Sequence, residues 1–337
     1  MSQIDDPHGR LRQLVMGFRA SQLIYVAAKL GLADQLANGP RDTATLAAAV
    51  GAAPQPLYRL LRALASIGLL NETEDRMFAL TPLGQPLRRD AAKSLKSTAL
   101  LYGDTAFWSA YGQMLHSVLT GETAFEHAHG KAMYAYLAED AAAASLFHEA
   151  MSGFSEHEIA AILDASDFSA DATIVDVGGG QGALVAALLA AHSRLRGIIL
   201  DQEDLADSAR DLLARAGLTD RARFIGGDFF QAVPREGSAY LLKSVIHNWD
   251  DAAAQRILQV CRQAMPRSAR LIVMERVIPA ADTPSEAKLF DINMLVTVGG
   301  QERTRDEHRM LLRAAGFALK RVTPTKSQLS LIEAVPD

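Results

Sequence analysis

The sequence predicts an α/β fold, with a doubly wound, mostly parallel sheet in the C-terminal half behind a mainly helical N-terminal half. Three observations predict it. Short apolar runs alternate with helical stretches after residue 171, whereas apolar residues recur at helical spacing before it. The chain ends in two apolar runs joined by a short polar turn. Alternating strands and helices build a parallel sheet, and the final two runs form an antiparallel hairpin at one edge.

The C-terminal elements follow from the change between two periodicities. Runs rich in Val, Ile and Leu are typical of buried strands, and longer stretches with apolar residues three and four apart are typical of helices. Strands are predicted over 173–177, 197–200, 222–225, 239–244, 270–275, 318–323 and 329–334, and helices over 181–191, 204–216 and 251–265.

A helix, a turn and a second helix are predicted near the N-terminus. Thr43 or Thr45 can cap the first helix, and Gly51 ends it. The order is that of a winged helix: helices over 46–50 and 54–67, strands over 69–72 and 77–80 around a polar turn at 74–76, and a further helix opened by Thr81-Pro82.

The pattern of elements changes near residue 170, after the polar segment 164–171. We therefore expect three parts: a winged-helix-like domain over 1–95, a helical linker region over 96–170, and the sheet domain over 171–337.

Composition and charge exclude several classes of protein. The 337 residues are 49% hydrophobic, so the chain can bury sizeable cores, and the net charge of −5 gives no field that would draw it onto nucleic acid. Residues 1–95 carry 11 Lys and Arg against 8 Asp and Glu, and the second helix offers only Arg59 and Arg62. These are too few phosphate contacts for a DNA-binding winged helix, so no nucleic-acid partner is expected.

The sequence predicts a cytoplasmic protein without a membrane partner. Two aspartates and scattered arginines occupy the N-terminus, where a secretory signal needs an apolar core, and no span of about 20 apolar residues follows. Cys261 is the single cysteine, which excludes an intramolecular disulfide and a multi-cysteine zinc site.

The strongest local motif is a buried strand that runs into a glycine-rich turn and then a helix, IVDVGGGQG at 174–182. Glycines such as Gly178 and Gly180 let the backbone approach a ligand closely, and the helix N-terminus offers free N–H donors. Asp201 ends the next apolar run, where its carboxylate can accept both hydroxyls of a ribose. These residues predict an adenosine-type ligand across the carboxyl ends of the strands.

A second segment offers contacts to the base of such a ligand. Gly227, Asp228 and Phe229 follow the third strand. Asp228 can accept a hydrogen bond from the exocyclic amine of adenine, and Phe229 can cover the face of the base. A capped loop is the alternative interpretation.

The glycine turn by itself leaves the ligand open. Gly178, Gly180 and Ala183 also satisfy the loose dinucleotide fingerprint G-x-G-x-x-G/A, so a nicotinamide oxidoreductase is a second hypothesis. Three features argue against an oxidoreductase: Asp176 lies inside the strand, the nucleotide domain comes last in the chain, and the sheet ends in an antiparallel hairpin.

His247 follows the buried apolar run 240–246, whose carboxyl end points at the ligand crevice of an open α/β sheet. Glu275 and Glu302 also lie at or just beyond the ends of apolar elements, so the three side chains are expected to share a site. A metal site is the competing interpretation of such a set. The pair Asp250-Asp251 is interpreted as a helix cap, and no metal is expected.

Seven segments in order resemble one family, and the likeness covers nearly the whole chain. The chain resembles the S-adenosyl-L-methionine (SAM)-dependent O-methyltransferases of the caffeic acid and hydroxyindole type, including bacterial members that methylate polyketide and phenazine phenols. The matching segments are DVGGGQG at 176–182, LDQ at 200–202, GDFF at 227–230, LLKSVIHNWDD at 241–251, IVMERVIP at 272–279, GGQERT at 299–304 and LLRAAGF at 311–317.

The resemblance implies a Rossmann-like class I methyltransferase domain over 171–337, and a homodimer formed through the domain over 1–95. It implies transfer of the methyl group of SAM to a phenolic hydroxyl of an aromatic secondary metabolite, with S-adenosyl-L-homocysteine as product. A relative that binds SAM without transferring methyl, such as a regulator, is the alternative.

The resemblance also implies roles for single residues. His247 would be the general base, oriented by Glu275 and Glu302. Many relatives carry Asp directly after this histidine, where this chain has Asn248. The cofactor contacts would be Asp176, Gly178, Gly180, Asp201, Gly227, Asp228, Phe229 and Lys243. The walls of the acceptor pocket would be Met151 and Met294, with Trp108, Phe147, Trp249 and Phe154 as weaker candidates.

Overall fold

The computed structural model describes residues 6–73 and 76–337. The chain divides into two compact units: unit 1 is Met1–Gly112 with Tyr134–Gly153, and unit 2 is Gln113–Met133 with Phe154–Asp337. Residues 96–170, predicted as one linker region, are divided between the units. Glu74 and Asp75 of the predicted polar turn lie outside the described residues.

Unit 1 is mainly helical and contains the predicted helix, turn and helix followed by a hairpin. Its small sheet has the order β1-β3-β2, with both pairs antiparallel. The elements are α1 (Pro7–Val15), α2 (Phe18–Lys29), α3 (Leu32–Gln35), β1 (Arg41–Asp42), α4 (Thr43–Val50), α5 (Pro54–Ser66), β2 (Leu70–Glu72), β3 (Met77–Leu80), η1 (Gln85–Leu87), α6 (Lys96–Gly103), α7 (Thr105–Gly112) and α10 (Met133–Glu139), and α11 (Ala141–Ala165) runs on into unit 2.

Two local expectations for unit 1 were wrong. Asp42 caps α4, since its Oδ1 accepts the backbone N–H of Thr45 at 2.9 Å, whereas Thr43 and Thr45 were the predicted caps. The helix predicted from Thr81-Pro82 is only the short 3₁₀ turn η1, because Pro86 has no N–H to continue an α-helix. Gly51 ends α4 as predicted, in the left-handed region at φ 67°.

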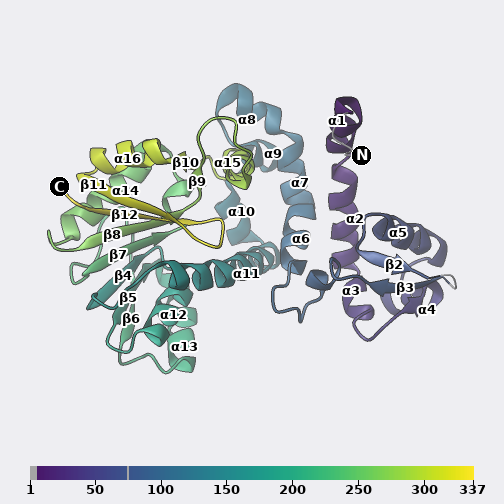
Figure 1. Ribbon diagram of the computed structural model, residues 1–337, viewed down its shortest axis with the longest axis horizontal. Coiled ribbons are helices and arrows are strands. Elements are labelled where there is room, and N and C mark those ends of the chain that lie inside the picture. Colours follow the sequence, from purple (N-terminus) through teal and green to yellow (C-terminus); the bar gives the residue numbers. More distant parts are fainter. Residues whose placement is uncertain (1–5, 74–75) are drawn as a thin grey trace. The chain divides into compact units, whose positions relative to one another are not determined.

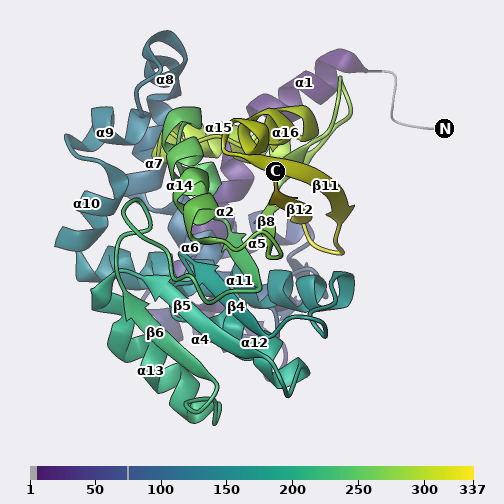
Figure 2. The same ribbon diagram turned by 90° about the vertical axis from the view of Figure 1, so that its left-hand side faces the viewer.

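Unit 2 is built on a seven-stranded sheet in the order β11-β12-β8-β7-β4-β5-β6. Five strands are parallel and β12 runs antiparallel between β8 and β11, so the predicted hairpin does close one edge (Figures 1 and 2). The strands are β4 (Thr173–Val177), β5 (Arg196–Asp201), β6 (Ala222–Gly226), β7 (Ala239–Lys243), β8 (Arg270–Glu275), β11 (Phe317–Pro324) and β12 (Ser330–Pro336).

Helices cover both faces of this sheet, because successive side chains along each strand point to opposite faces. Val175 and Leu242 pack with α14 (Asp251–Ala264) and α16 (Arg305–Ala314) in one core. Ile174 and Leu241 pack in the other core with α12 (Ala183–Ala191), α13 (Ala206–Arg215) and the end of α11. Figure 1 shows the two pairs of helices on opposite sides of the sheet.

Shorter elements complete unit 2. A two-stranded parallel pair, which the sequence pattern did not predict, joins residues next to Glu275 and Glu302. The elements are α8 (Met114–Thr120), α9 (Ala124–His129), η2 (Glu203–Leu205), η3 (Ile246–Asn248), β9 (Val277–Ile278), α15 (Glu286–Thr297) and β10 (Arg303–Thr304). Within residues 6–73 and 76–337, no helix combines the length and apolar character needed to cross a bilayer.

Candidate active site

The carboxyl ends of β4, β5, β7 and β8 lie at one edge of the sheet, because these strands are parallel. The glycine turn follows β4, and its backbone takes left-handed conformations at Gly178 (φ 73°), Gly180 (φ 57°) and Gly182 (φ 85°). A Cβ at Gly178 would lie 2.8 Å from a methyl group of Val245, and one at Gly180 would meet no atom within 4 Å. The turn is therefore crowded at Gly178 and leaves open space beside its backbone at Gly180.

Asp201 ties this turn to the end of β5. Its Oδ2 accepts the backbone N–H of Gly180 at 2.7 Å, and its Oδ1 accepts the N–H of Gln202 at 2.8 Å. Each carboxylate oxygen has a second lone pair, so Asp201 keeps the capacity to accept the hydroxyls of a ribose.

Asp176 is a buried carboxylate inside β4, and its Oδ1 has no hydrogen-bond partner in the described part of the structure. Burial raises the pKa of Asp176 to about 7, although the Lys243 ammonium lowers it. Such an acceptor fits a ligand that carries an ammonium group, because an added positive charge favours the ionised carboxylate. The residues at the glycine turn therefore fit an amino-acid-bearing nucleoside.

The segment after β6 is a capped loop. Asp228 is exposed, and it accepts hydrogen bonds from the backbone N–H of Phe230 at 2.8 Å and from the side-chain amide of Gln231 at 3.0 Å. The N–H of Gly227 donates to the backbone oxygen of Asp201, which places this loop beside the end of β5. Phe229 is half-buried there.

Lys243 ends β7, and two residues of α11 contact its ammonium. Nζ lies 2.7 Å from Oε2 of Glu158 and donates to Oγ of Ser155 at 3.1 Å. The side chains of Lys243 and Glu158 are 12% and 9% exposed, so this ion pair is largely shielded from water.

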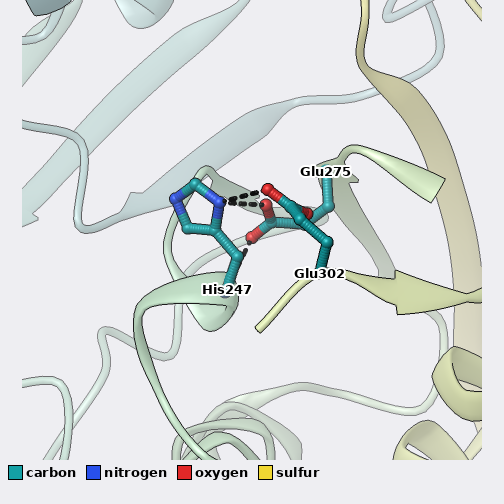
Figure 3. Close-up of side chains that lie close together, drawn as sticks. All are labelled: His247, Glu275 and Glu302. Atoms are coloured by element: carbon teal, nitrogen blue, oxygen red, sulfur yellow. Dashed lines mark hydrogen bonds and ion pairs between the residues drawn. The ribbon is translucent and has the colours of Figure 1, made fainter. Parts of the chain in front are cut away.

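His247, Glu275 and Glu302 meet as predicted, each buried (Figure 3). Nδ1 of His247 lies 2.9 Å from Oε1 of Glu302 and 3.4 Å from Oε2 of Glu275. Figure 3 shows Nδ1 turned towards both carboxylates and the other ring nitrogen turned away from them. Carboxylates accept hydrogen bonds, so they place the proton of a neutral imidazole on Nδ1 and leave a lone pair on Nε2.

The pKa of His247 reflects opposing effects. Burial lowers it, but the carboxylates of Glu275 and Glu302 outweigh burial and raise the pKa above its usual value, while Arg276 opposes them. Burial raises the pKa of Glu275, although the neighbouring imidazole lowers it. The arrangement stabilises an imidazolium, which is the state of a base after it has taken a proton.

The loop that carries His247 is held by side chains from distant segments. Glu275 Oε1 accepts the backbone N–H groups of Val245 at 3.0 Å and His247 at 3.3 Å. The buried guanidinium of Arg303 donates to the backbone oxygens of Ile246 and Trp249. These contacts fix the backbone on both sides of His247, so its ring has a defined position.

The segment 299–304 lies against the loop that carries His247. The N–H of Gln301 donates to the backbone oxygen of His247 at 2.9 Å, and a Cβ at Gly300 would collide with that oxygen. Gly300 is therefore required for this close approach. Asn248, the departure from the family pattern, donates from its side-chain amide to the backbone oxygen of Ser244 at 3.2 Å.

His247, Glu275 and Glu302 are also residue types that hold metal ions, and their ligand atoms lie within 4.8 Å of one another. Positive charge is already supplied there by Arg276, whose Nη1 lies 3.8 Å from Oε1 of Glu302. A resident cation competes with a metal ion for the same carboxylate oxygens. Asp250 and Asp251 have structural roles: Asp250 caps α14, and Asp251 forms an ion pair with Arg303.

The predicted acceptor-pocket residues belong to different units. Trp108, Phe147 and Met151 lie in unit 1, and Trp249 and Met294 lie in unit 2. The ring of Trp249 packs edge-on against Phe230 and Phe229, with ring centroids 4.8 Å and 6.4 Å apart. Met294 is buried. The side chain of Phe154 lies outside the described part of the structure.

Sequence reasoning missed several residues of this region. Arg276 and Glu158 were not singled out, although Arg276 directly follows Glu275. Phe290 of α15 lies parallel to His247, with ring centroids 6.3 Å apart. Ser244 has a positive φ of 55°, unusual for a residue other than glycine. A single sequence carries no signal for these spatial relationships.

Comparison with known proteins agrees with this architecture. A family model described as O-methyltransferase domain matches residues 111–318, and one described as O-methyltransferase dimerisation domain matches residues 12–90. The chain is 43% identical over 326 residues to the phenazine O-methyltransferase PhzM of Lysobacter antibioticus, which covers 97% of this chain and 95% of that protein. It is 36% identical over 326 residues to the phenazine-1-carboxylate N-methyltransferase of Pseudomonas aeruginosa, with 96% of each covered.

A solved structure is similar over almost the same length. It is an O-methyltransferase (NcsB1) from neocarzinostatin biosynthesis in complex with SAM and 2-hydroxy-5-methyl naphthoic acid. The TM-score is 0.83 at 32% identity, covering 94% of this chain and 96% of that chain.

Proposed function

The chain belongs to the family of SAM-dependent O-methyltransferases, and on that premise we propose that it methylates a hydroxyl group of an aromatic small molecule with His247 as general base. The observation that carries the proposal is the 2.9 Å contact between Nδ1 of His247 and Glu302. This contact orients the imidazole ring, so that Nε2 is turned away from the two carboxylates.

The family assignment decides between the two cofactors that the glycine turn left open. The cofactor is SAM, which when bound supplies an activated methyl group on a sulfonium. We assign its methionine end to Asp176, Gly178 and Gly180, and its ribose to Asp201. Gly227, Asp228 and Phe229 would contact the adenine, and Lys243 would lie beside the adenosine.

Methyl transfer needs an oxygen nucleophile held in line with the methyl group. Positioning of two reactants can contribute roughly 7 to 11 kcal/mol, so the shape of the pocket supplies most of the acceleration. A phenol has a pKa near 10 and is little ionised at neutral pH. Nε2 of His247 would accept its proton as the oxygen attacks, for about 10²- to 10⁴-fold. Glu275 and Glu302 then stabilise the imidazolium.

The acceptor is proposed from the relatives and from the residue types of the predicted pocket walls. A phenazine methyltransferase and a naphthoate-bound structure are similar over nearly the whole chain. Met151, Met294, Phe147, Trp108 and Trp249 remain the proposed walls, since methionine and aromatic faces suit a flat ring. A homodimer through residues 1–95 is proposed from the match to the dimerisation domain.

The test is a screen of hydroxylated phenazines, naphthoates and simple phenols with methyl-labelled SAM. We expect label in at least one aromatic ether, and loss of turnover in His247→Ala with S-adenosyl-L-homocysteine affinity nearly unchanged. An unchanged rate in His247→Ala rejects the base. Labelling only of ring nitrogens rejects the hydroxyl acceptor, and cofactor binding with no labelled product favours a regulator.

A further inference from the structure

A chain of six ionisable side chains links the cofactor edge of unit 2 to His247. It begins at Lys243 and continues through Glu158 and Arg276 to Glu302. It then reaches His247 and Glu275. All but Lys243 are buried, and the Lys243 side chain is 12% exposed. We call this set the ionic chain.

Arg276 is the bridging member of the ionic chain. Its Nη2 lies 3.7 Å from Oε1 of Glu158, and its Nη1 lies 3.8 Å from Oε1 of Glu302, which is the oxygen that contacts His247. The guanidinium is held in this orientation by two further contacts. Nε donates to Oε1 of Gln328 at 3.1 Å, and Cζ lies 3.9 Å from the ring centroid of Phe290.

The charges of the ionic chain balance when the group of His247, Glu275 and Glu302 holds one added proton, on the ring or on a carboxylate. When the imidazole is neutral and the three carboxylates are ionised, three negative charges face the two positive charges of Lys243 and Arg276. When His247 also carries a proton, three negative charges face three positive charges. Unbalanced charge is costly in a buried site, so the ionic chain favours the state that holds this proton, and the pKa of His247 is raised. Without Arg276, the carboxylates would bind that proton more tightly, and a tightly protonated imidazole cannot act as a base at neutral pH.

The other elements around His247 add few charges to this balance. Residue Glu275 contacts the ring from the end of β8, and Glu302 from the segment before β10. From α15 come Phe290, which lies parallel to the ring, and Asp291, which accepts the N–H of Glu302. At the start of α14, Asp251 is paired with Arg303.

We propose that Arg276 is a positioning residue for the transfer reaction: its guanidinium, divided between Glu158 and Glu302, holds the Glu302 carboxylate at Nδ1 of His247 and keeps the imidazole available as a base. The role in the reaction rests on the proposed function of His247. The electrostatic effect of Arg276 on the imidazole does not, and the two are measured separately.

The experiment measures the protonation of His247 directly. The ring Cε1–H of His247, assigned by comparison with His247→Ala, is followed by NMR across pH 5 to 9 in the intact, cofactor-free enzyme. Arg276→Met keeps the aliphatic packing and removes the charge, so the midpoint should rise by about one pH unit. Arg276→Lys keeps the charge and should restore the midpoint to within a few tenths of the wild-type value.

A second variant acts at a distance and in the opposite direction. Glu158→Gln removes a negative charge, so the Arg276 guanidinium faces the charge of Glu302 alone. The titration midpoint of His247 should therefore fall. The near-isosteric glutamine side chain makes folding the expected outcome, and this variant decides the matter if Arg276→Met does not fold. Arg321→Met is the matched control, because the Arg321 side chain is 62% exposed and, within the described residues, its guanidinium pairs only with Glu333 at the sheet edge. It should leave the midpoint unchanged.

Unchanged midpoints in both Arg276→Met and Glu158→Gln would overturn the proposal, as would an Arg276→Lys shift as large as that of Arg276→Met. The pH dependence of kcat/KM tests the underlying function separately. It should follow the NMR midpoint in each variant. If the midpoints move and the rate profile does not follow, the base assignment of His247 fails while the electrostatic role of Arg276 stands.

Discussion

Oε1 of Glu302 lies 2.9 Å from Nδ1 of His247, although 55 residues separate them in the sequence. The same oxygen is 3.8 Å from Nη1 of Arg276, so one carboxylate oxygen faces both the proposed base and a fixed cation. This relationship makes the charge on Glu302 more important than its size.

Glu302→Gln should lower kcat/KM roughly 10²-fold, because a neutral amide at Nδ1 stabilises an imidazolium poorly. Affinity for S-adenosyl-L-homocysteine, measured by calorimetry, should stay within a factor of two or so. Glu286→Gln, at the exposed start of α15, is the matched control and should keep full activity. Full activity in Glu302→Gln would remove this residue from the mechanism.

Asp201→Asn should weaken binding of S-adenosyl-L-homocysteine by roughly 10- to 100-fold. The carboxylate holds the N–H of Gly180 and is assigned to the ribose, and hydrogen bonds to a charged group contribute about 1.5 to 3 kcal/mol. Calorimetric titration measures the change. Asp207→Asn on α13, whose side chain is 98% exposed, should bind normally. Equal affinities for both variants would exclude Asp201 from the cofactor site.

Activity should persist in excess EDTA, because Arg276 supplies the positive charge beside Glu302 and Nδ1 of His247 contacts the carboxylates directly. Initial rates before and after dialysis against the chelator check this. A strict loss that added Mg²⁺ or Zn²⁺ restores would show instead that His247, Glu275 and Glu302 hold a metal ion.

His308 on α16 should make the protein sensitive to acid. Burial, together with the nearby charge of Arg303, lowers the pKa of this ring to about 4. The unfolded chain therefore binds the proton first, and stability falls as the pH drops from 6.5 towards 4, by up to about 3 kcal/mol. His308→Leu should remove this slope in urea denaturation at pH 4.5 and 7.5. An identical slope in the variant would place the acid sensitivity elsewhere.

Replacing Leu11, Leu14 and Val15 on α1 by Ser should weaken a dimer. These three side chains are 61 to 62% exposed in the single chain, and exposed apolar faces of this kind mark association surfaces. Light scattering at micromolar concentration should give a dimer for the wild-type protein and a smaller average mass for the variant. A monomeric wild-type protein would contradict the proposal.

Most of the sheet could be predicted because strand and helix patterns are local. The buried run 173–177 and the run 270–275 match β4 and β8 residue for residue, since continuous apolar runs bounded by polar residues specify parallel strands. Glycine turns are equally local, because a left-handed backbone conformation strongly favours glycine.

By itself, the sequence determined the α/β architecture and the cofactor edge, because periodicity and motif are properties of neighbouring residues, and its resemblance to a family singled out His247, Glu275 and Glu302. Only the tertiary structure decided how these side chains meet. Three features depend on distances between segments far apart in the chain: the contacts of Arg276 with Glu158 and Glu302, the hydrogen bonds from Arg303 to the loop that carries His247, and the close backbone approach at Gly300. Such distances follow from the packing of whole elements.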